Sequence, residues 1–244
     1  MRLPCAVAPL LALLVAACGS PSTTVATSGG PAPTAPQATP ATVAVQGSLD
    51  NTLYESAVTP ISDGRGQYLF VGKTGGGRAR RALLRFELTG SLPPGARVQS
   101  VTLALNASRA ANAEPREVRL HRALAAWGEG TSDSAANEGG GAAATPGDAT
   151  WLFRLFDSER WQAAGGDYVA AASGSLTVAG VGPYEWPSTP GLVADVQAWL
   201  ADPARNHGWV LVGDESATRT TKRFDSREHP LEANRPVLRI TFVR

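Results

Sequence analysis

The sequence predicts an all-β protein, an antiparallel β-sandwich or jelly roll with one short helix and a long Gly/Ala-rich loop. From Val43 onward, short segments alternate apolar and polar residues. Turn-forming residues separate them, as at Pro93-Pro94-Gly95. A strand with one apolar side belongs to a sheet that faces a core on one face, and many such strands build a sandwich or jelly roll.

Eight strands are expected along the chain. In order they span residues 67–72, 82–88, 101–106, 118–120, 175–178, 208–213, 222–224 and 238–242. In the second of them Leu84, Phe86 and Leu88 share one side, which is the pattern of a half-buried strand. The glycine-rich run 72–77 after the first strand predicts a hairpin loop, since it lacks the residue order of a phosphate-binding loop.

One segment has a helical period instead. Apolar residues recur there at three- and four-residue spacing: Val193, Val196, Trp199 and Leu200. This predicts one short amphipathic helix that ends at Asp202-Pro203, because proline cannot continue a helix. Residues 128–149 are rich in Gly, Ala, Ser and Thr and predict a long surface loop, where binding residues are common. The segment 183–187 reads as a further loop.

Charge and cysteine content exclude several classes of function. The chain has 22 Lys+Arg against 21 Asp+Glu and a net charge of +1, so nucleic acid is not expected as a partner, nor is a polybasic membrane patch. The two cysteines, Cys5 and Cys18, stand near the N-terminus. The rest of the chain has no thiol for a disulfide, a zinc site or a nucleophile.

The N-terminus predicts export and lipid anchoring. Ala6 to Ala17 is an apolar run too short to span a bilayer comfortably, which is typical of a secretory signal. The segment 15–18 resembles a bacterial lipobox, in which the chain is cut before Cys18 and that residue is acylated. Several acyl chains on one residue anchor stably. The alternative is a plain signal peptide with Cys18 a bystander.

Three regions are therefore expected: a lipoprotein signal peptide at 1–17, a Pro/Thr/Ala-rich disordered tether at 18–42, and a β-sandwich domain at 43–244. The tether carries no charge and no apolar period, so it cannot bury a core. The expected location is the bacterial cell envelope. Gly19 in place of Asp favours the outer membrane, as in the lipoproteins that the segment resembles.

A series of motifs points to a family. They are Arg81–Phe86, Trp151, Trp161 with Gly165-Gly166-Asp167, Asp195–Leu200, Asn206–Trp209, Lys222–Glu228 and Arg235–Leu238. In this order, over roughly residues 45–244, they resemble the DNRLRE domain, which is similar to carbohydrate-binding module family 96. The resemblance implies a non-catalytic β-sandwich that binds polysaccharides, acidic ones included. The contiguous string of the family's name is absent, and residues 224–228 are the nearest segment.

Aromatic residues are the first candidates for a sugar site, because the apolar face of a pyranose packs on a ring. Those in or near expected loops are Trp127, Trp151, Trp161, Tyr184 and Trp186. The alternative is that these rings cap the core, as large aromatics usually do. Trp199 and Trp209 are expected in the core, because both stand in apolar periodic segments.

Arginines are the second candidates, because a planar guanidinium grips a carboxylate with two parallel bonds. Arg85, Arg223 and Arg227 lie in the family-like motifs and could meet the carboxylate of a uronic acid. The alternative is an internal role, in which Arg227 pairs with Glu228 or Asp225 and locks two strands together.

Catalysis, metals and cofactors find little support. The three histidines are scattered, Gly-x-Ser-x-Gly is absent, and no spacing selects a pair of catalytic carboxylates. Loop acids such as Asp50 or Asp148 could serve calcium, but no run of alternating acids accompanies them, so no metal and no cofactor is expected.

The sequence thus predicts a membrane-tethered, non-enzymatic module that binds a polysaccharide. Two alternatives stay open, a structural or adhesive envelope protein that binds protein partners, and a polysaccharide hydrolase or lyase.

Overall fold

The computed structural model describes residues 39–135 and 138–244. The expected signal peptide, the lipidation site Cys18 and nearly all of the tether lie outside these residues. Ala41 and Thr42, assigned to the tether, already belong to the first strand, so the boundary at 43 is two residues late. Within the described part, no helix has the length and apolar character needed to cross a bilayer.

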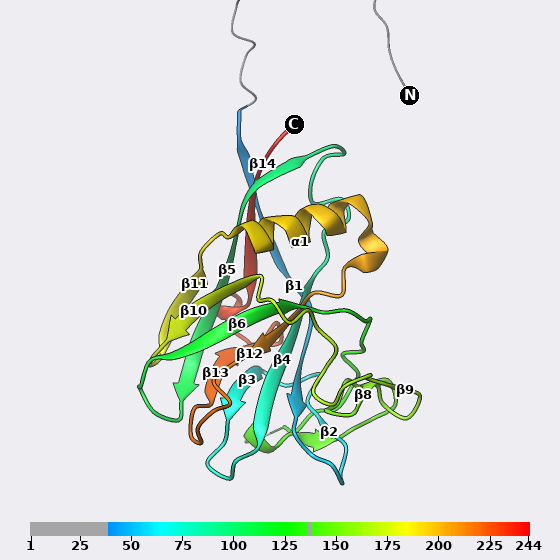
Figure 1. Cartoon of the computed structure of the whole chain (residues 1–244), viewed down its shortest axis with the longest axis vertical. Coiled ribbons are helices and arrows are strands. Elements are labelled where there is room, and N and C mark those ends of the chain that lie inside the picture. The colour runs from blue at the N-terminus through cyan, green and yellow to red at the C-terminus, as the bar shows by residue number, and fades with distance from the viewer. Residues whose placement is uncertain (1–38, 136–137) are drawn as a thin grey trace, which may run out of the picture. The chain divides into compact units, whose positions relative to one another are not determined.

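Six antiparallel strands close a barrel, and the all-β prediction is confirmed (Figure 1). In order around the ring they are β1 (Ala41–Tyr54), β14 (Val237–Val243), β5 (Arg97–Ala110), β13 (Lys222–Asp225), β3 (Tyr68–Lys73) and β4 (Ala79–Phe86). The long strand β1 closes the ring by pairing in succession with two partners. Val43 lies opposite Ile240 of β14, and further along β1 Thr52 lies opposite Ala82 of β4.

Shorter strands extend this barrel. They are β12 (Trp209–Val212), β6 (Arg116–Arg122) and β10 (Gly174–Val178) beyond β4, and β11 (Gly182–Trp186) beside β5. Two separate two-stranded sheets are also present, β2 (Ile61–Ser62) with β7 (Ala142–Ala143) and β8 (Phe153–Leu155) with β9 (Glu159–Arg160). Short 3-10 turns occupy Glu138–Gly140, Pro203–Arg205 and Glu232–Asn234.

All eight expected strands are present. The prediction of a loop at 183–187 is wrong. Its residues form β11, which pairs with residues 103–107 of β5. Two prolines bound the segment, and its position at the side of β5 explains why a strand tolerates them.

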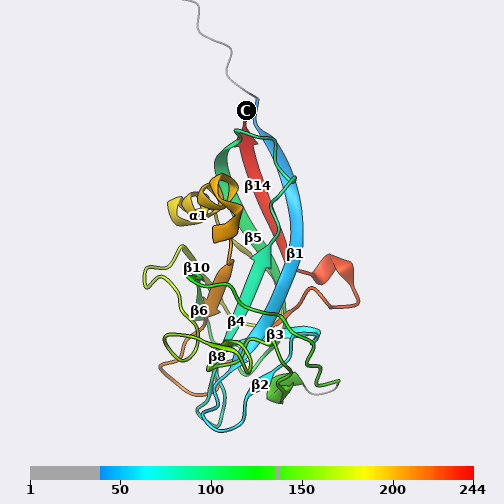
Figure 2. The same ribbon diagram turned by 90° about the vertical axis from the view of Figure 1, so that its right-hand side faces the viewer.

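The main core fills the barrel, and one helix covers it. Helix α1 (Pro190–Ala201) begins at the N-cap Thr189, whose hydroxyl accepts a hydrogen bond from the Leu192 amide. The helix lies to one side of β5 and β14 (Figure 2). It buries Leu192, Val196 and Trp199 in the main core, where Trp209 also lies. The helix and the core positions of both tryptophans are therefore confirmed.

A second core lies on the outer side of β1, β4 and β12. Leu53, Leu83 and Val210 face outward from these strands and pack against a smaller cluster that includes Trp127 and Trp161. The segment between β6 and β10 supplies these rings, so it folds over the barrel as a cap.

The Gly/Ala-rich loop is less exposed than expected. The side chain of Asp148 holds it through hydrogen bonds to backbone groups of the loop. The Asp148 carboxylate is buried and accepts the backbone N–H groups of Thr131 at 2.8 Å and Thr145 at 2.6 Å. Gly130 is required beside it, since its φ is +75° and an added Cβ would lie 1.4 Å from the carboxylate oxygen.

Candidate functional site

Three of the five aromatic residues predicted to bind a sugar are buried in the structure. Trp186 is 0% exposed, and Trp127 and Trp161 are each 6% exposed. Their indole N–H groups donate to backbone carbonyls within the protein, those of Val118, His207 and Thr150 respectively. No ring face of these three is open to a sugar, so their assignment as ligand-binding residues is corrected in favour of core packing.

The other two aromatics are half-buried and already in contact. The Arg81 guanidinium stands over the Trp151 ring, 4.9 Å from its centroid. The Tyr184 hydroxyl closes the turn between β10 and β11, accepting from the Ala179 amide and donating to the Gly180 carbonyl, both at 3.1 Å. Trp151 belongs to the cap and Tyr184 to β11, and no described contact brings them together.

The Arg227 side chain forms ion pairs within the protein. Its guanidinium grips Glu129 with two bonds of 2.7 and 2.6 Å and also lies 2.8 Å from Glu228. The pairing with Glu228 agrees with the internal alternative, whereas the partner Glu129, 98 residues away, was not foreseen. Arg85 is about one-third exposed, and its side chain lies 3.5 Å from Glu87.

Three carboxylates gather around Arg227. One oxygen each from Asp50, Glu129 and Glu228 lies within 4.8 Å of the others, which is the geometry a divalent cation would need. Arg227 supplies positive charge at this point, and its backbone N–H also donates to Asp50 at 2.8 Å. Three acids against one arginine leave excess negative charge, and burial together with the charges of Glu228 and Glu129 raises the pKa of Asp50.

This cluster makes stability depend on pH. Burial, opposed by Arg227 and reinforced by Glu129, raises the pKa of Glu228 to about 7. A carboxyl whose pKa rises on folding contributes stability that is complete below its unfolded pKa and is lost as the pH rises through its folded pKa. The free energy of unfolding is therefore expected to fall on the order of 1–2 kcal/mol between about pH 5 and about pH 8 through this group.

Glu228→Gln should flatten that dependence, as measured by urea unfolding at both pH values. Glu232→Gln is the matched control, because Glu232 is exposed. Equal pH slopes in the wild type and in Glu228→Gln would contradict this assignment.

A cavity of about 230 Å³ lies where β3 turns into β4, at the end of β5 and beside β13. Three arginines from three strands line it, Arg80 of β4, Arg109 of β5 and Arg223 of β13. Phe70 and Thr221 are also in the wall. We call this the arginine cavity.

Two of the three guanidinium groups contact aromatic rings and neutral oxygen atoms. Arg223 lies over the Tyr68 ring at 3.7 Å from its centroid and donates from Nε to the Ser108 hydroxyl at 3.1 Å. Arg80 lies over the Tyr54 ring at 4.8 Å and donates from Nη1 to its neighbour's carbonyl at 2.9 Å.

No carboxylate of the described residues forms an ion pair with the arginines of this cavity. Among the described residues, none of the three forms an ion pair, and the Arg109 side chain forms no hydrogen bond. Arg80 is buried, and its Nε has no partner. Burial, reinforced by the nearby charge of Arg78 and opposed by Tyr54 and Glu55, lowers the pKa of Arg80. An anion would satisfy these groups.

Only one of these three arginines is a candidate binding residue from the sequence. Arg223 lies in a motif of the family resemblance, whereas Arg80 and Arg109 belong to no motif, and their convergence depends on the pairing of β5 with β13. The sequence feature that could have indicated these two residues is the position of each arginine near the end of a strand, beside a short polar turn.

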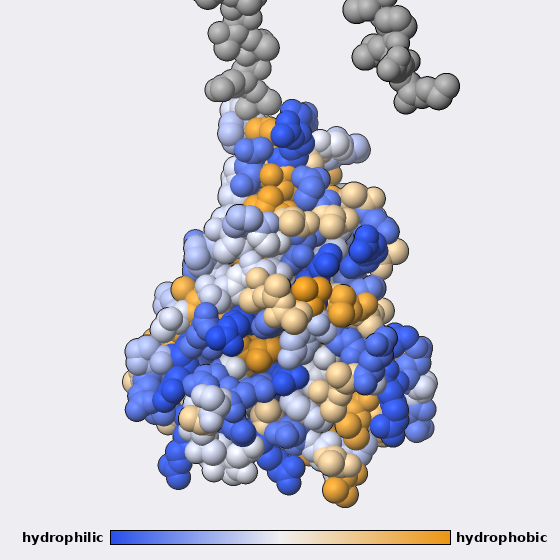
Figure 3. Space-filling model, in the orientation of Figure 1, coloured by the Kyte–Doolittle hydropathy of each residue, from blue (hydrophilic) through white to orange (hydrophobic). Residues whose placement is uncertain are grey.

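The face shown in Figure 3 carries several small apolar patches separated by hydrophilic residues, not one broad apolar area. No protein-family model matches the chain, and no curated protein is significantly similar to it. The function is therefore inferred from the geometry of the cavities.

Proposed function

We propose that the protein is a non-catalytic module that binds an acidic polysaccharide, with the arginine cavity as the site of the acid group. The observation that carries this proposal is the convergence of Arg80, Arg109 and Arg223 without a described carboxylate partner. A guanidinium matches a carboxylate or sulfate with two parallel bonds. The proposal keeps the ligand class expected from the sequence and moves the site away from the buried tryptophans.

The size of the cavity favours a polymer over a free small molecule. Small-molecule sites commonly measure roughly 300–1,000 Å³, and the arginine cavity measures about 230 Å³. It therefore suits the acidic edge of one sugar residue, while the rest of the chain would continue over the surface.

The lining favours binding over hydrolysis. The residues around the arginine cavity include no Asp, Glu or His, so the wall offers no carboxylate pair of the kind that glycosidases use. Of the acids that gather around Arg227, Glu129 and Glu228 pair with its guanidinium and Asp50 accepts from its backbone N–H.

Affinity electrophoresis of the full chain tests this function. We expect retardation in a gel that contains polygalacturonate and none in a gel that contains dextran. Arg109→Ala and Arg223→Ala should each weaken the retardation about tenfold or more, because each removes charge-assisted hydrogen bonds. Arg239→Ala is the control, since Arg239 is exposed and pairs with Glu185 at 2.9 Å. Equal migration of the wild type in both gels, or an equal effect of Arg239→Ala, would remove the proposal.

The proposal includes a lipid anchor at Cys18, supported by the small residues before it at the end of the apolar run. Cys18→Ala should abolish incorporation of labelled fatty acid and leave the protein out of the membrane fraction. Continued labelling would refute the anchor.

The finer fold assignment, a sandwich of the DNRLRE type, belongs to the same proposal. It is supported by the way in which β1 and β3 each change partner along their length, which divides the strand pairings into two sets.

A further inference from the structure

A small cavity, of about 80 Å³, lies between the end of β6 and the segment that leads into β12. Arg122, Ala123 and Leu124 line it from the β6 side, and Arg205 and His207 line it from the segment before β12. Three of these five residues are basic and none is acidic. We call it the histidine cavity.

His207 differs from the other two histidines of the chain in having no partner for its ring. Nδ1 of His121 lies 2.9 Å from the Val169 carbonyl oxygen, and Nδ1 of His229 accepts from the Leu231 amide at 3.2 Å. Neither ring nitrogen of His207 forms a hydrogen bond in the described part of the chain, and neither is among the buried polar atoms that lack a partner. Since His207 is half-buried and lines the cavity, its ring nitrogens are accessible to a ligand.

Positive charge surrounds this ring. Burial lowers the pKa of His207, and the charges of three arginines add to this effect, those of Arg85, Arg154 and Arg205. The imidazole is therefore neutral at pH 7, and an anion beside it would favour its protonated form.

The carboxylates of this region are paired with other arginines. Three pairs are present, Arg85 with Glu87, Arg122 with Asp195 and Arg154 with Glu159. Arg205 is exposed, and its side chain forms no ion pair or hydrogen bond with a described residue. Arg122 faces Asp195 through Nε at 3.4 Å, and its two Nη atoms form no hydrogen bond and are not buried. The histidine cavity thus has donors of positive charge that a ligand can reach.

The size of the histidine cavity limits the ligand to a small group. One water molecule needs roughly 10–15 Å³ of such space. The cavity, at about 80 Å³, therefore holds a group of several heavy atoms, and a whole sugar ring is too large for it.

We propose that the histidine cavity binds one tetrahedral oxyanion group, sulfate or phosphate, held by Arg122, Arg205 and the protonated ring of His207. Guanidinium groups form charge-assisted hydrogen bonds to such oxygen atoms, and a protonated imidazole donates from both nitrogens. The anion and the proton each strengthen the binding of the other. This site is independent of the polysaccharide function, because it shares no lining residue with the arginine cavity.

The test follows the three imidazoles of the full chain by NMR between about pH 5 and about pH 8. The sample contains either sodium sulfate or sodium chloride at equal ionic strength, so that screening is the same in both. Sulfate stays fully ionised over this range. We expect it to raise the pKa of His207 by about one unit above the value in chloride, which corresponds to about tenfold tighter binding by the protonated form. The signals of His121 and His229 should titrate alike in the two salts.

A sugar ester distinguishes two sources of the oxyanion. Glucose 6-sulfate carries the same group on a larger molecule. A rise in the pKa of His207 equal to that in sulfate would show that the cavity accepts an ester group of a larger molecule. A rise in sulfate alone would show that its ligand is the free ion.

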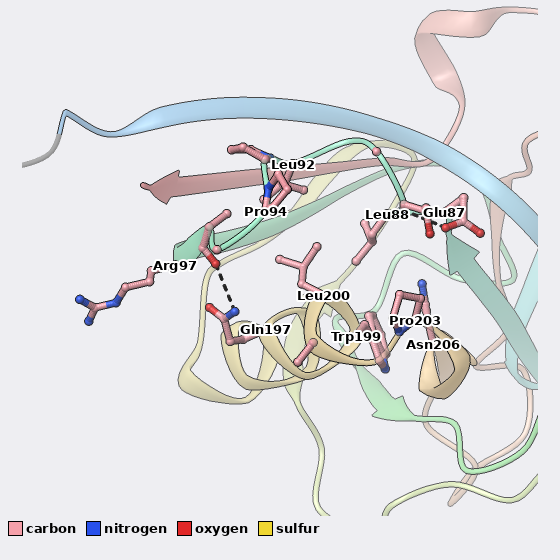
Figure 4. A pocket seen from close by; sticks show the side chains of 16 residues that line it. Glu87, Leu88, Leu92, Pro94, Arg97, Gln197, Trp199, Leu200, Pro203 and Asn206 are labelled. Atoms are coloured by element: carbon pink, nitrogen blue, oxygen red, sulfur yellow. Dashed lines mark hydrogen bonds between the residues drawn. The ribbon is translucent and has the colours of Figure 1, made fainter.

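Two variants complete the test. Arg205→Ala should abolish the difference between the two salts. Arg97→Ala removes the same charge and should preserve the difference. Arg97 is an exposed arginine in the wall of a separate cavity of about 480 Å³ between α1 and the β4–β5 connection, and its guanidinium points away from that cavity (Figure 4).

Three results would overturn the proposal. They are an equal titration of His207 in the two salts, an equal response of all three histidines to sulfate, and a sulfate effect that survives Arg205→Ala. The first two come from the wild type and decide the matter even if a variant fails to fold. None of them depends on binding of polygalacturonate.

Discussion

Replacing Asp195 by alanine is expected to lower the free energy of unfolding by about 3 kcal/mol, because two buried donors lose their charged acceptor. Asp195 projects from α1 and is buried. It accepts from Trp209 Nε1 at 2.9 Å and from the Ser173 hydroxyl, and it lies 3.4 Å from Arg122. The variant would leave the Trp209 N–H unsatisfied in the main core and remove the polar contacts that join the helix to Ser173 and to Arg122 of β6.

Chemical denaturation measures this effect, with Asp202→Ala as the control. Asp202 ends the same helix and its side chain accepts from the Ala204 amide at 3.2 Å in an exposed position, so its loss should cost about 1 kcal/mol or less. A similar small cost for Asp195→Ala would show that α1 is held by apolar contacts alone.

Lys222→Met is expected to cost about 3 kcal/mol, because charged donors contribute roughly 1.5–3 kcal/mol per hydrogen bond and burial offsets part of the sum. The Lys222 ammonium is buried and donates to the carbonyls of Asn112, Glu114 and Ala179. It thereby joins the β5–β6 turn to the β10–β11 turn. Burial, with the charge of Arg116, lowers the pKa of Lys222.

The chain supplies a matched control, since Lys73 is its other lysine. The Lys73 ammonium donates to one carbonyl, that of Glu215, at 3.2 Å, and Lys73→Met should cost less than about 1 kcal/mol. Equal midpoints of urea unfolding for the two variants would contradict the role assigned to Lys222.

The strands that could be predicted from sequence are those with one apolar and one polar side. Strand β14 alternates Leu238, Ile240 and Phe242 with more polar residues, and all three are buried. Strand β1 was not expected, because its second half buries Asp50, Asn51 and Thr52 side by side. The cap covers the outer face of this half, so burial there follows no alternation.

The candidate site was less predictable, because a tryptophan in a polar segment reads alike whether it binds a sugar or fills a core. Trp161 stands among polar residues and Trp127 precedes Gly128-Glu129, yet each satisfies its N–H with a carbonyl brought by the fold, from His207 in the case of Trp127. Arg80 and Arg109 line one cavity because β13 and β3 pair between β5 and β4, and no local pattern encodes that pairing.

The way in which the barrel closes also bears on the kinetics of folding. Ala41 at the start of β1 pairs with Phe242, two residues from the end of the chain. Such a non-local contact carries a large loop-closure entropy, and high contact order slows the search for the native state. The ring cannot be completed during synthesis until the last strand has emerged. We expect the barrel of the nascent chain to stay open until then.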